Sequence, residues 1–309
     1  KDRCQEQFAY GHVDVIRPYL GLDERYFLVG RLAHGEWGSP FPRAGGGVFR
    51  GTNGLELPTW TWNNKWADWH RSLGAKKVHA IGAPWLYLLA SAQIPTVWDR
   101  SCGTSDFAAG TRSDRIAQLF IPIHSWERDI LDLRRTLDVS VEILAPHERE
   151  TTVVLGWGDF LSREIREAYL DNGFKIECNG YRGGSLSPSS KLGDRTRFLP
   201  NLLDLLRRAE CVISNEVSTA LIYALSLGIP SHVHPGLLQA SRGALAFVQS
   251  DYRSQSQIEE LLDHHATEFS WLIAPDPVID FDAEHLREAL GGDSFRSPSD
   301  LASILEWSH

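Results

Sequence analysis

The sequence contains no methionine, although it has 11 tryptophans and 13 phenylalanines among its 309 residues. A chain without methionine even at position 1 either has been trimmed or has lost methionines from its recorded sequence; in the second case some local spacings are short by one. Cysteine is also scarce, and the four residues form no CxxC pair: Cys4, Cys102, Cys178 and Cys211. Scattered cysteines argue against a structural zinc site and favour a reducing, cytoplasmic setting.

Long apolar runs and a surplus of positive charge are absent too. No stretch of about 18 apolar residues occurs, which argues against a membrane-spanning helix, and residues 1–10 lack the apolar core of a secretory signal. With 31 basic and 40 acidic residues the formal net charge is −9. Because neutralising phosphates requires concentrated basic residues, we expect no nucleic-acid partner. The sequence has no basic amphipathic helix that would indicate binding to a membrane surface, although peripheral association stays open.

What the sequence does contain is an alternation of strand and helix patterns. With 42% apolar and 23% charged residues, the composition is that of a globular protein, and the length favours two domains. In the C-terminal half we expect strands at 152–155, 174–178, 211–213 and 231–234, of which 152–155 is a β-branched run and 211–213 an apolar one. Apolar spacings of three and four residues predict helices at 160–172, 200–209 and 217–227. This alternation is typical of a parallel sheet with crossover helices.

The N-terminal half alternates less clearly. Its patterns predict strands at 26–32, 77–81 and 116–123 and helices at 63–73, 84–91 and 127–137. A charged cluster at 147–150 suggests a domain boundary near 140–150. Two or three helices follow residue 257, one of them from about Ser299, a candidate N-cap, to Trp307. Four tryptophans, of which three lie at helix spacing, are interpreted as core packing rather than sugar stacking: Trp60, Trp62, Trp66 and Trp69.

In open α/β sheets, ligands bind beyond the carboxyl ends of the strands, so the residues after each predicted strand are the candidates for a binding site. After the strand at 211–213 the chain runs through Ser214, Asn215, Glu216, Ser218 and Thr219 directly into a helix. Free backbone N–H groups and two hydroxyls there form a candidate phosphate site. The alternative is ordinary helix capping by Ser or Thr. The Lys and glycine pattern of a P-loop is absent, which argues against an ATPase of that type.

Three further segments follow predicted strands. One segment is Asn179, Gly180, Tyr181 and Arg182. Its glycine permits close backbone approach, Tyr181 offers a ring for base stacking, and Arg182 is a candidate partner for a phosphate. The alternative is a surface turn. His124 and Ser125 follow the strand at 116–123, where a histidine is either functional or structural.

His34 and Glu36 lie among glycines after the strand at 26–32 and are candidates for the base that deprotonates an acceptor hydroxyl. The alternative for His34 is a histidine hydrogen-bonded within a loop. His232 and His234 lack a third ligand at diagnostic spacing, so we expect no metal site.

These residues resemble a known family. The segments 198–204, 212–224 and 227–230 resemble the donor-binding half of GT-B-type glycosyltransferases, in particular bacterial polysialyltransferase and capsular polysaccharide transferase proteins. His34-Gly35 and the segment 81–87 are similar to the N-terminal half of that group. The resemblance implies an α/β fold of two Rossmann-like domains facing across a cleft. It makes 1–145 the acceptor-side domain and 146–309 the nucleotide-sugar-binding domain with C-terminal helices.

The resemblance also implies an activity: metal-independent transfer of a sugar from a nucleotide sugar to a glycan or lipid-linked glycan acceptor, with no cofactor. In this activity Ser218 and Thr219 hold the donor phosphate, 179–182 face the base or ribose, and His124 contacts the leaving phosphate. A nucleotide-sugar epimerase of the same fold and a non-catalytic nucleotide- or glycan-binding protein stay open as alternatives.

The sequence departs from the family pattern in two places. The His-Pro pair of sialyltransferases is not found at His124, where Ser125 follows, and the one His-Pro pair of this chain is His234-Pro235. The acidic-acidic-glycine stretch that carries the catalytic base in some of those families is also absent. These departures leave the donor open and the base unassigned between His34 and Glu36.

Overall fold

The structure is a computed structural model that describes residues 10–23, 25–32, 58–72, 74–99, 114–122, 133–147, 150–180, 198–243, 255–305 and 307–308. Its contacts divide the chain into two compact units. The first consists of Lys1–Asp99, Tyr181–Pro200 and Asp282–His309, and the second of Arg100–Gly180 and Asn201–Phe281. The expected boundary at residue 145 would divide the chain into two consecutive pieces, whereas each of these units is assembled from segments that are distant in the sequence.

The second unit is built on a five-stranded parallel sheet. Its strands are β5 (Gln118–Phe120), β6 (Thr151–Leu155), β7 (Lys175–Cys178), β8 (Val212–Ser214) and β9 (Ser231–Val233). They lie in the order β7-β6-β5-β8-β9, and every neighbouring pair is parallel. Numbered along the chain this order is 3-2-1-4-5, which is that of a Rossmann fold. The α/β class and the Rossmann-like character expected for the C-terminal half are therefore confirmed.

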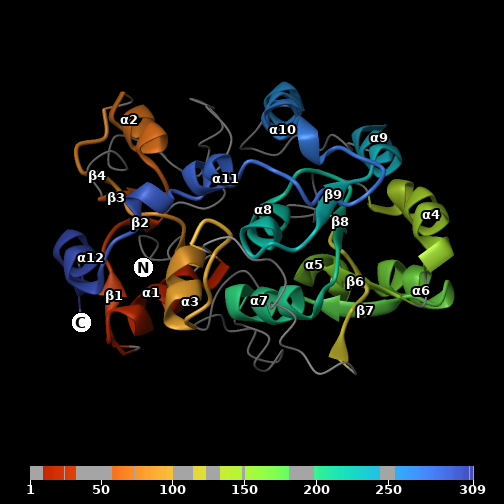
Figure 1. Ribbon diagram of the computed structural model, residues 1–309, viewed down its shortest axis with the longest axis horizontal. Coiled ribbons are helices and arrows are strands. Elements are labelled where there is room, and N and C mark those ends of the chain that lie inside the picture. Colours follow the sequence, from red (N-terminus) through yellow and green to blue (C-terminus); the bar gives the residue numbers. More distant parts are fainter. Residues whose placement is uncertain are drawn as a thin grey trace. The chain divides into compact units, whose positions relative to one another are not determined.

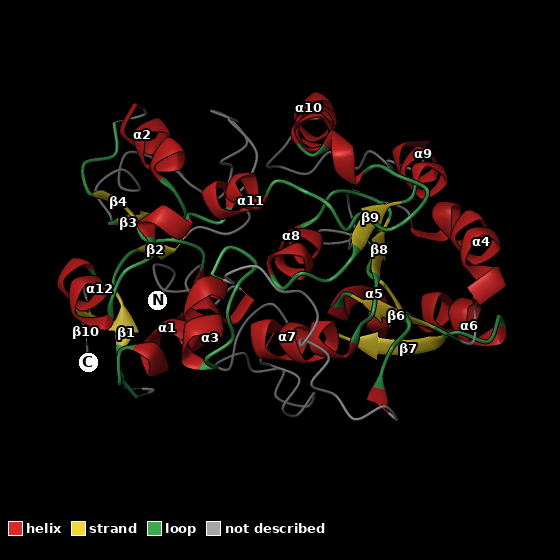
Figure 2. Ribbon diagram, viewed as in Figure 1, coloured by secondary structure: helices red, strands yellow, loops and turns green. Residues whose placement is uncertain are grey.

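Helices connect these strands and cover the sheet (Figures 1 and 2). They are α4 (Leu133–Leu144), α5 (Trp157–Leu161), α6 (Arg163–Asp171), α7 (Phe198–Arg208), α8 (Thr219–Ser226), α9 (Pro235–Gly243) and α10 (Gln255–Glu268). Right-handed crossovers place α4 and α6 on one face and α7 and α8 on the other. One core joins the sheet to α4, α6, α9 and α10 through buried Leu144, Tyr169, Leu237 and Leu262. The strands β6, β8 and β9 are buried throughout, as expected for a covered parallel sheet.

The first unit contains two small sheets. Strands β2 (Arg31–Leu32), β3 (Thr59–Thr61) and β4 (Val78–Ala80) form a parallel sheet, and β1 (Phe27–Leu28) pairs antiparallel with β10 (Trp307–Ser308). The helices are α1 (His12–Tyr19), α2 (Asn64–Ser72), α3 (Pro84–Ser91), α11 (Ala283–Ala289) and α12 (Pro298–Ile304). Trp60 and Trp62 are fully buried, so core packing, the interpretation given to the tryptophans, holds for both.

The C-terminal segment from Asp282 is fastened to the rest of the first unit by hydrogen bonds. The Tyr87 hydroxyl donates to the Ile81 carbonyl and accepts from the Arg296 amide at 3.3 Å. The Tyr19 hydroxyl donates to the Arg296 carbonyl at 2.9 Å. Burial raises the pKa of Tyr87, which keeps this hydroxyl protonated as a donor. These contacts explain why the end of the chain returns to the unit that contains its beginning.

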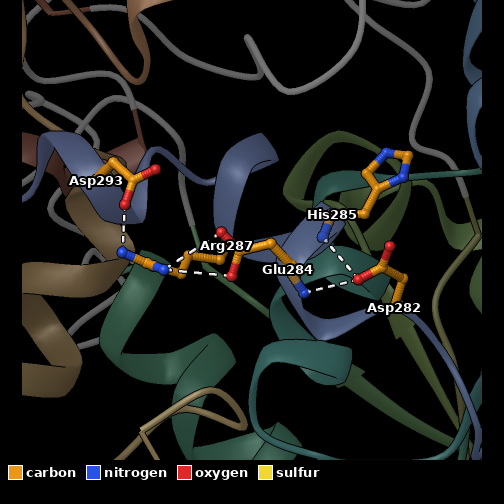
Figure 3. Close-up of polar contacts among 5 residues, drawn as sticks. All are labelled: Asp282, Glu284, His285, Arg287 and Asp293. Atoms are coloured by element: carbon orange, nitrogen blue, oxygen red, sulfur yellow. Dashed lines mark hydrogen bonds and ion pairs between the residues drawn. The ribbon is translucent and has the colours of Figure 1, made fainter.

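Two side-chain caps begin helices in this segment. Asp282 Oδ1 accepts from the Glu284 and His285 amides at 2.9 and 3.2 Å, and Arg287 pairs with Glu284 and Asp293 (Figure 3). Ser297 accepts from the Asp300 amide at 3.2 Å and is the N-cap of α12. The expected cap at Ser299 is therefore wrong by two residues, because Pro298 already occupies the first turn.

Other elements also differ from expectation. The helix expected at 160–172 is broken at Ser162, whose extended backbone ends α5 and begins α6. Leu161, four residues before Ile165, is 51% exposed, whereas Ile165 and Tyr169 are buried. The strand expected at 26–32 is two short strands, and α4 continues to Leu144, beyond the end of the helix expected at 127–137. Gly173 and Gly228, just after α6 and α8, have left-handed φ values of 85° and 77°, which are typical of glycines that end helices.

Candidate functional site

The strand order places a candidate site at the carboxyl ends of β5 and β8. These neighbours are the strands at which the crossover direction reverses, and ligands of open α/β sheets bind outside the carboxyl edge at such a point. The chain leaves β5 through Ile121 and Pro122, and it leaves β8 through Asn215 and Glu216. The segments expected to bind the donor, which begin at His124 and at Ser214, thus follow two adjacent strands. His124 and Ser125 themselves lie outside the described residues.

Ser214 ties the ends of these two strands together. Its hydroxyl is fully buried and donates to the Ile121 carbonyl at 2.6 Å, while its oxygen accepts from the Glu216 amide at 3.4 Å. Both contacts are internal to the second unit, so Ser214 fixes the course of the loop after β8. Its expected contact with a donor stays a prediction.

Ser218 is the N-cap residue of α8, but its side chain does not cap the helix. Its φ of −127° and ψ of 159° are those of an extended N-cap, yet it makes no side-chain cap hydrogen bond. Its carbonyl accepts from the Leu221 amide at 3.1 Å. Its hydroxyl oxygen is shielded from solvent without a hydrogen-bond partner among the described residues. The capping alternative therefore does not describe Ser218, and the first amides of α8, at Thr219 and Ala220, begin the helix beside it.

Glu216 lies two residues before this N-cap and is 1% exposed. Arg242, near the end of α9, approaches it with two nitrogens: Nε lies 2.6 Å from Oε1, and Nη2 donates to Oε2 at 3.2 Å. Arg242 Nη1 also donates to Asp263 of α10 at 2.8 Å. Burial raises the pKa of Glu216 to about 7, against the opposing effect of the Arg242 guanidinium. Burial therefore outweighs the ion pair, and Glu216 titrates near neutrality.

Asn179 and Gly180 follow β7 at the same edge of the sheet. Gly180 has a φ of 98°, a conformation that favours glycine, and its amide donates to Cys178 Sγ at 3.5 Å. Asn179 is 5% exposed, and its Oδ1 has no hydrogen-bond partner among the described residues. The expected close approach of the Gly180 backbone to a ligand stays a prediction. Tyr181 and Arg182 lie outside the described residues, as do His34 and Glu36.

Several histidines lie near this edge. Burial lowers the pKa of His232 to about 4 and that of His265 to about 3, and each has a second histidine beside it. His234 Nδ1 accepts from the Gly236 amide at 3.2 Å. Within the described ranges no three His, Cys, Asp or Glu side chains come together in a way that could hold a metal ion. No helix in the described part of the chain is long and apolar enough to cross a membrane.

Arg242 is the residue that the sequence patterns did not reveal. It lies 26 positions after Glu216, near the end of a different helix, and no local motif marks it. The sequence revealed Ser214, Asn215 and Glu216 because they are consecutive and precede a helix. Arg242 comes into contact with Glu216 only when the chain folds.

Comparison with known proteins gives distant likenesses. No family model matches the chain, and no curated protein matches it. A protein assigned as a UDP-N-acetylglucosamine 2-epimerase of Listeria monocytogenes is 14% identical, with a TM-score of 0.35 over 80% of this chain and 58% of that one. A mutant of S. aureus TarM, solved with UDP, fondaparinux and alpha-GlcNAc-glycerol, is 8% identical, with a TM-score of 0.32 over 88% and 49%.

WaaG, a glycosyltransferase involved in lipopolysaccharide biosynthesis, is 15% identical, with a TM-score of 0.30 over 80% of this chain and 62% of that one. The chain thus spans between 49% and 62% of the length of these three proteins. Identities and TM-scores this low assign neither a family nor an activity to this chain.

Proposed function

We propose that the chain is a nucleotide-sugar-dependent glycosyltransferase whose second unit binds the donor phosphates at the start of α8. The observation that carries this proposal is the use of Ser218: a serine in the N-cap position whose hydroxyl does not cap the helix and has no partner among the described residues. It lies at the carboxyl edge of a sheet with Rossmann order, where nucleotides bind in this architecture.

The chemistry of glycosyl transfer fits such a position. As the glycosidic bond to the nucleotide breaks, negative charge grows on the departing phosphate. Backbone amides at a helix N-terminus and a hydroxyl stabilise that charge without a metal ion, because they are already oriented towards it. The amides of α8, with Ser218 and Thr219, would supply these donors. Asn179 and Gly180 would face the base or ribose.

The acceptor half of the reaction needs a base for the attacking hydroxyl. We assign this role to His34 or Glu36, on the sequence pattern alone, and the acceptor to a glycan or a lipid-linked glycan precursor. A surface polysaccharide of the capsule class is the product that the family resemblance favours.

The test is the double variant Ser218→Ala/Thr219→Ala. We expect loss of nucleotide binding and of sugar transfer by about 100-fold or more, the size of removing an oriented donor to a developing anion. We expect the melting temperature to stay within a few degrees of wild type. Ser297→Ala is the matched control, because Ser297 caps α12 in the first unit; it should lose stability and keep nucleotide binding. If the double variant unfolds instead, the two hydroxyls are needed to cap α8, and the proposal is contradicted.

Calorimetry against CMP, UDP, GDP and CDP compounds identifies the donor base. Incubating the protein with the bound nucleotide sugar and no acceptor then separates the alternatives. Turnover without acceptor indicates an epimerase, and binding without turnover on any acceptor indicates a non-catalytic binding protein. Absence of binding to every compound refutes the assignment of α8 as a phosphate site.

A further inference from the structure

Arg242 occupies an unusual electrostatic position. One guanidinium faces two carboxylates, Glu216 at 1% exposure and Asp263 at 74%, while Arg242 itself is 22% exposed. On one side the guanidinium meets a buried loop residue, and on the other it reaches a residue in solvent. It therefore lies where the loop between β8 and α8 borders water.

The net charge around Glu216 disfavours an anionic ligand. With both carboxylates ionised, the three side chains sum to one negative charge. From α9, Ser241 contributes only a neutral hydroxyl. From α10, His265 is uncharged at neutral pH because burial lowers its pKa to about 3, and His264 is paired with Glu268 at 3.1 Å. A phosphate brought to the start of α8 would meet a buried negative charge two residues away, and like charges repel strongly in a poorly solvated site.

Uptake of one proton removes this conflict. We propose that, when the donor's phosphates bind at the start of α8, Glu216 takes up a proton from solvent and releases Arg242, whose guanidinium then binds the phosphates. The inference rests on the proposed function and names Arg242 as a further phosphate-binding residue. The Arg242–Glu216 ion pair breaks, a guanidinium–phosphate pair forms, and Glu216 Oε gains the proton.

The properties of the two side chains support this exchange. A guanidinium stays charged and presents parallel N–H donors that fit a phosphate as well as a carboxylate. Glu216 has a pKa of about 7, so little free energy is needed to protonate it near neutrality. A bound anion raises that pKa further, because a neighbouring negative charge disfavours the ionised carboxyl group. Nucleotide binding therefore favours proton uptake by Glu216, and protonation of Glu216 favours nucleotide binding.

Calorimetry between about pH 6 and about pH 8.5 tests the linkage. UDP-N-acetylglucosamine, GDP-mannose and CMP-sialic acid serve as probes, because their esterified phosphates do not titrate in this range. Above pH 7 the affinity of the wild-type protein should fall by about tenfold per pH unit, the slope for one required proton. Titrations in two buffers of different ionisation enthalpy should show uptake approaching one proton per nucleotide at the alkaline end.

Variants separate this linkage from other titrations. Glu216→Gln should bind with little pH dependence and without proton uptake, whereas Arg242→Gln should bind weakly at every pH. Because Arg242→Gln leaves a buried carboxylate unpaired and endangers folding, the double variant Glu216→Gln/Arg242→Gln provides a neutral pair that should fold and bind weakly without pH dependence. Glu167→Gln, which removes a carboxylate from the exposed pair with Arg163 on α6, controls for net charge and should behave like wild type.

The outcomes distinguish the two proposals. If the wild-type protein binds a probe without proton uptake, or if the folded Arg242 variants bind as tightly as wild type, the role of Arg242 is refuted and the proposed function stands. If no probe binds the wild-type protein, the proposed function fails and this inference fails with it.

Discussion

The C-terminal segment of the first unit and the loop after β8 in the second unit use the same residue types in opposite ways. In the segment from Asp282, Asp282 and Ser297 both accept backbone N–H bonds and begin helices. In the loop, Ser218 occupies the equivalent position without capping, and Glu216 is buried against a distant arginine. In the first region both capping side chains accept hydrogen bonds from the backbone and so contribute stability. In the second region the Ser218 hydroxyl has no hydrogen-bond partner among the described residues, as the proposed phosphate site requires.

The largest effect on stability should come from a glycine of the first region that lies against fixed main chain. Gly291 has a φ of 69°, and an added Cβ would lie 1.7 Å from the Trp62 carbonyl oxygen. Gly291→Ala combines a left-handed backbone with overlap against fixed main chain, so it should cost about 3 kcal/mol or more. Denaturant unfolding measures this loss. Gly158→Ala, at a glycine with open space around it and an ordinary φ, is the control and should change stability little.

Glu216 should make the stability of the second region depend on pH. Its folded pKa of about 7 lies above the ordinary value of 4.5, so the folded state binds its proton more tightly than the unfolded state. Its contribution is fully present below about pH 4.5 and is lost as the pH rises to about 7, about 3 kcal/mol in total. Unfolding wild type and Glu216→Gln side by side isolates this term, because the acid destabilisation from buried His232 and His265 is common to both. Parallel curves contradict a buried, titrating Glu216.

The smallest effects test the contrast between the caps directly. Asp282→Ala and Ser297→Ala should each lower the free energy of unfolding by about 1 kcal/mol, the usual value of an N-cap. Ser218→Ala should lower it far less, since no cap hydrogen bond is lost. Thermal unfolding of the three variants gives the ranking. Equal losses at all three positions would show that Ser218 caps α8 in solution and would remove the contrast between the two regions.

Local patterns predicted much of the second unit. Short β-branched and apolar runs identified β6 and β8, because strands buried on both faces carry many such side chains. The consecutive residues Ser214 to Thr219 identified the loop before α8, because the residues after a strand and before a helix are adjacent in the chain. The prediction was weakest where a helix pattern hid a break, as at Ser162, whose extended backbone no apolar spacing reveals.

The sequence by itself located most strands and helices of the second unit and the polar groups that follow each strand, since these depend on neighbours a few positions away. Only the tertiary structure decided that β5 lies beside β8, that the chain from Asp282 rejoins the first unit, and that Arg242 meets Glu216. Pairing between strands and between buried charges joins residues far apart in the chain, and its energy depends on the burial that folding creates.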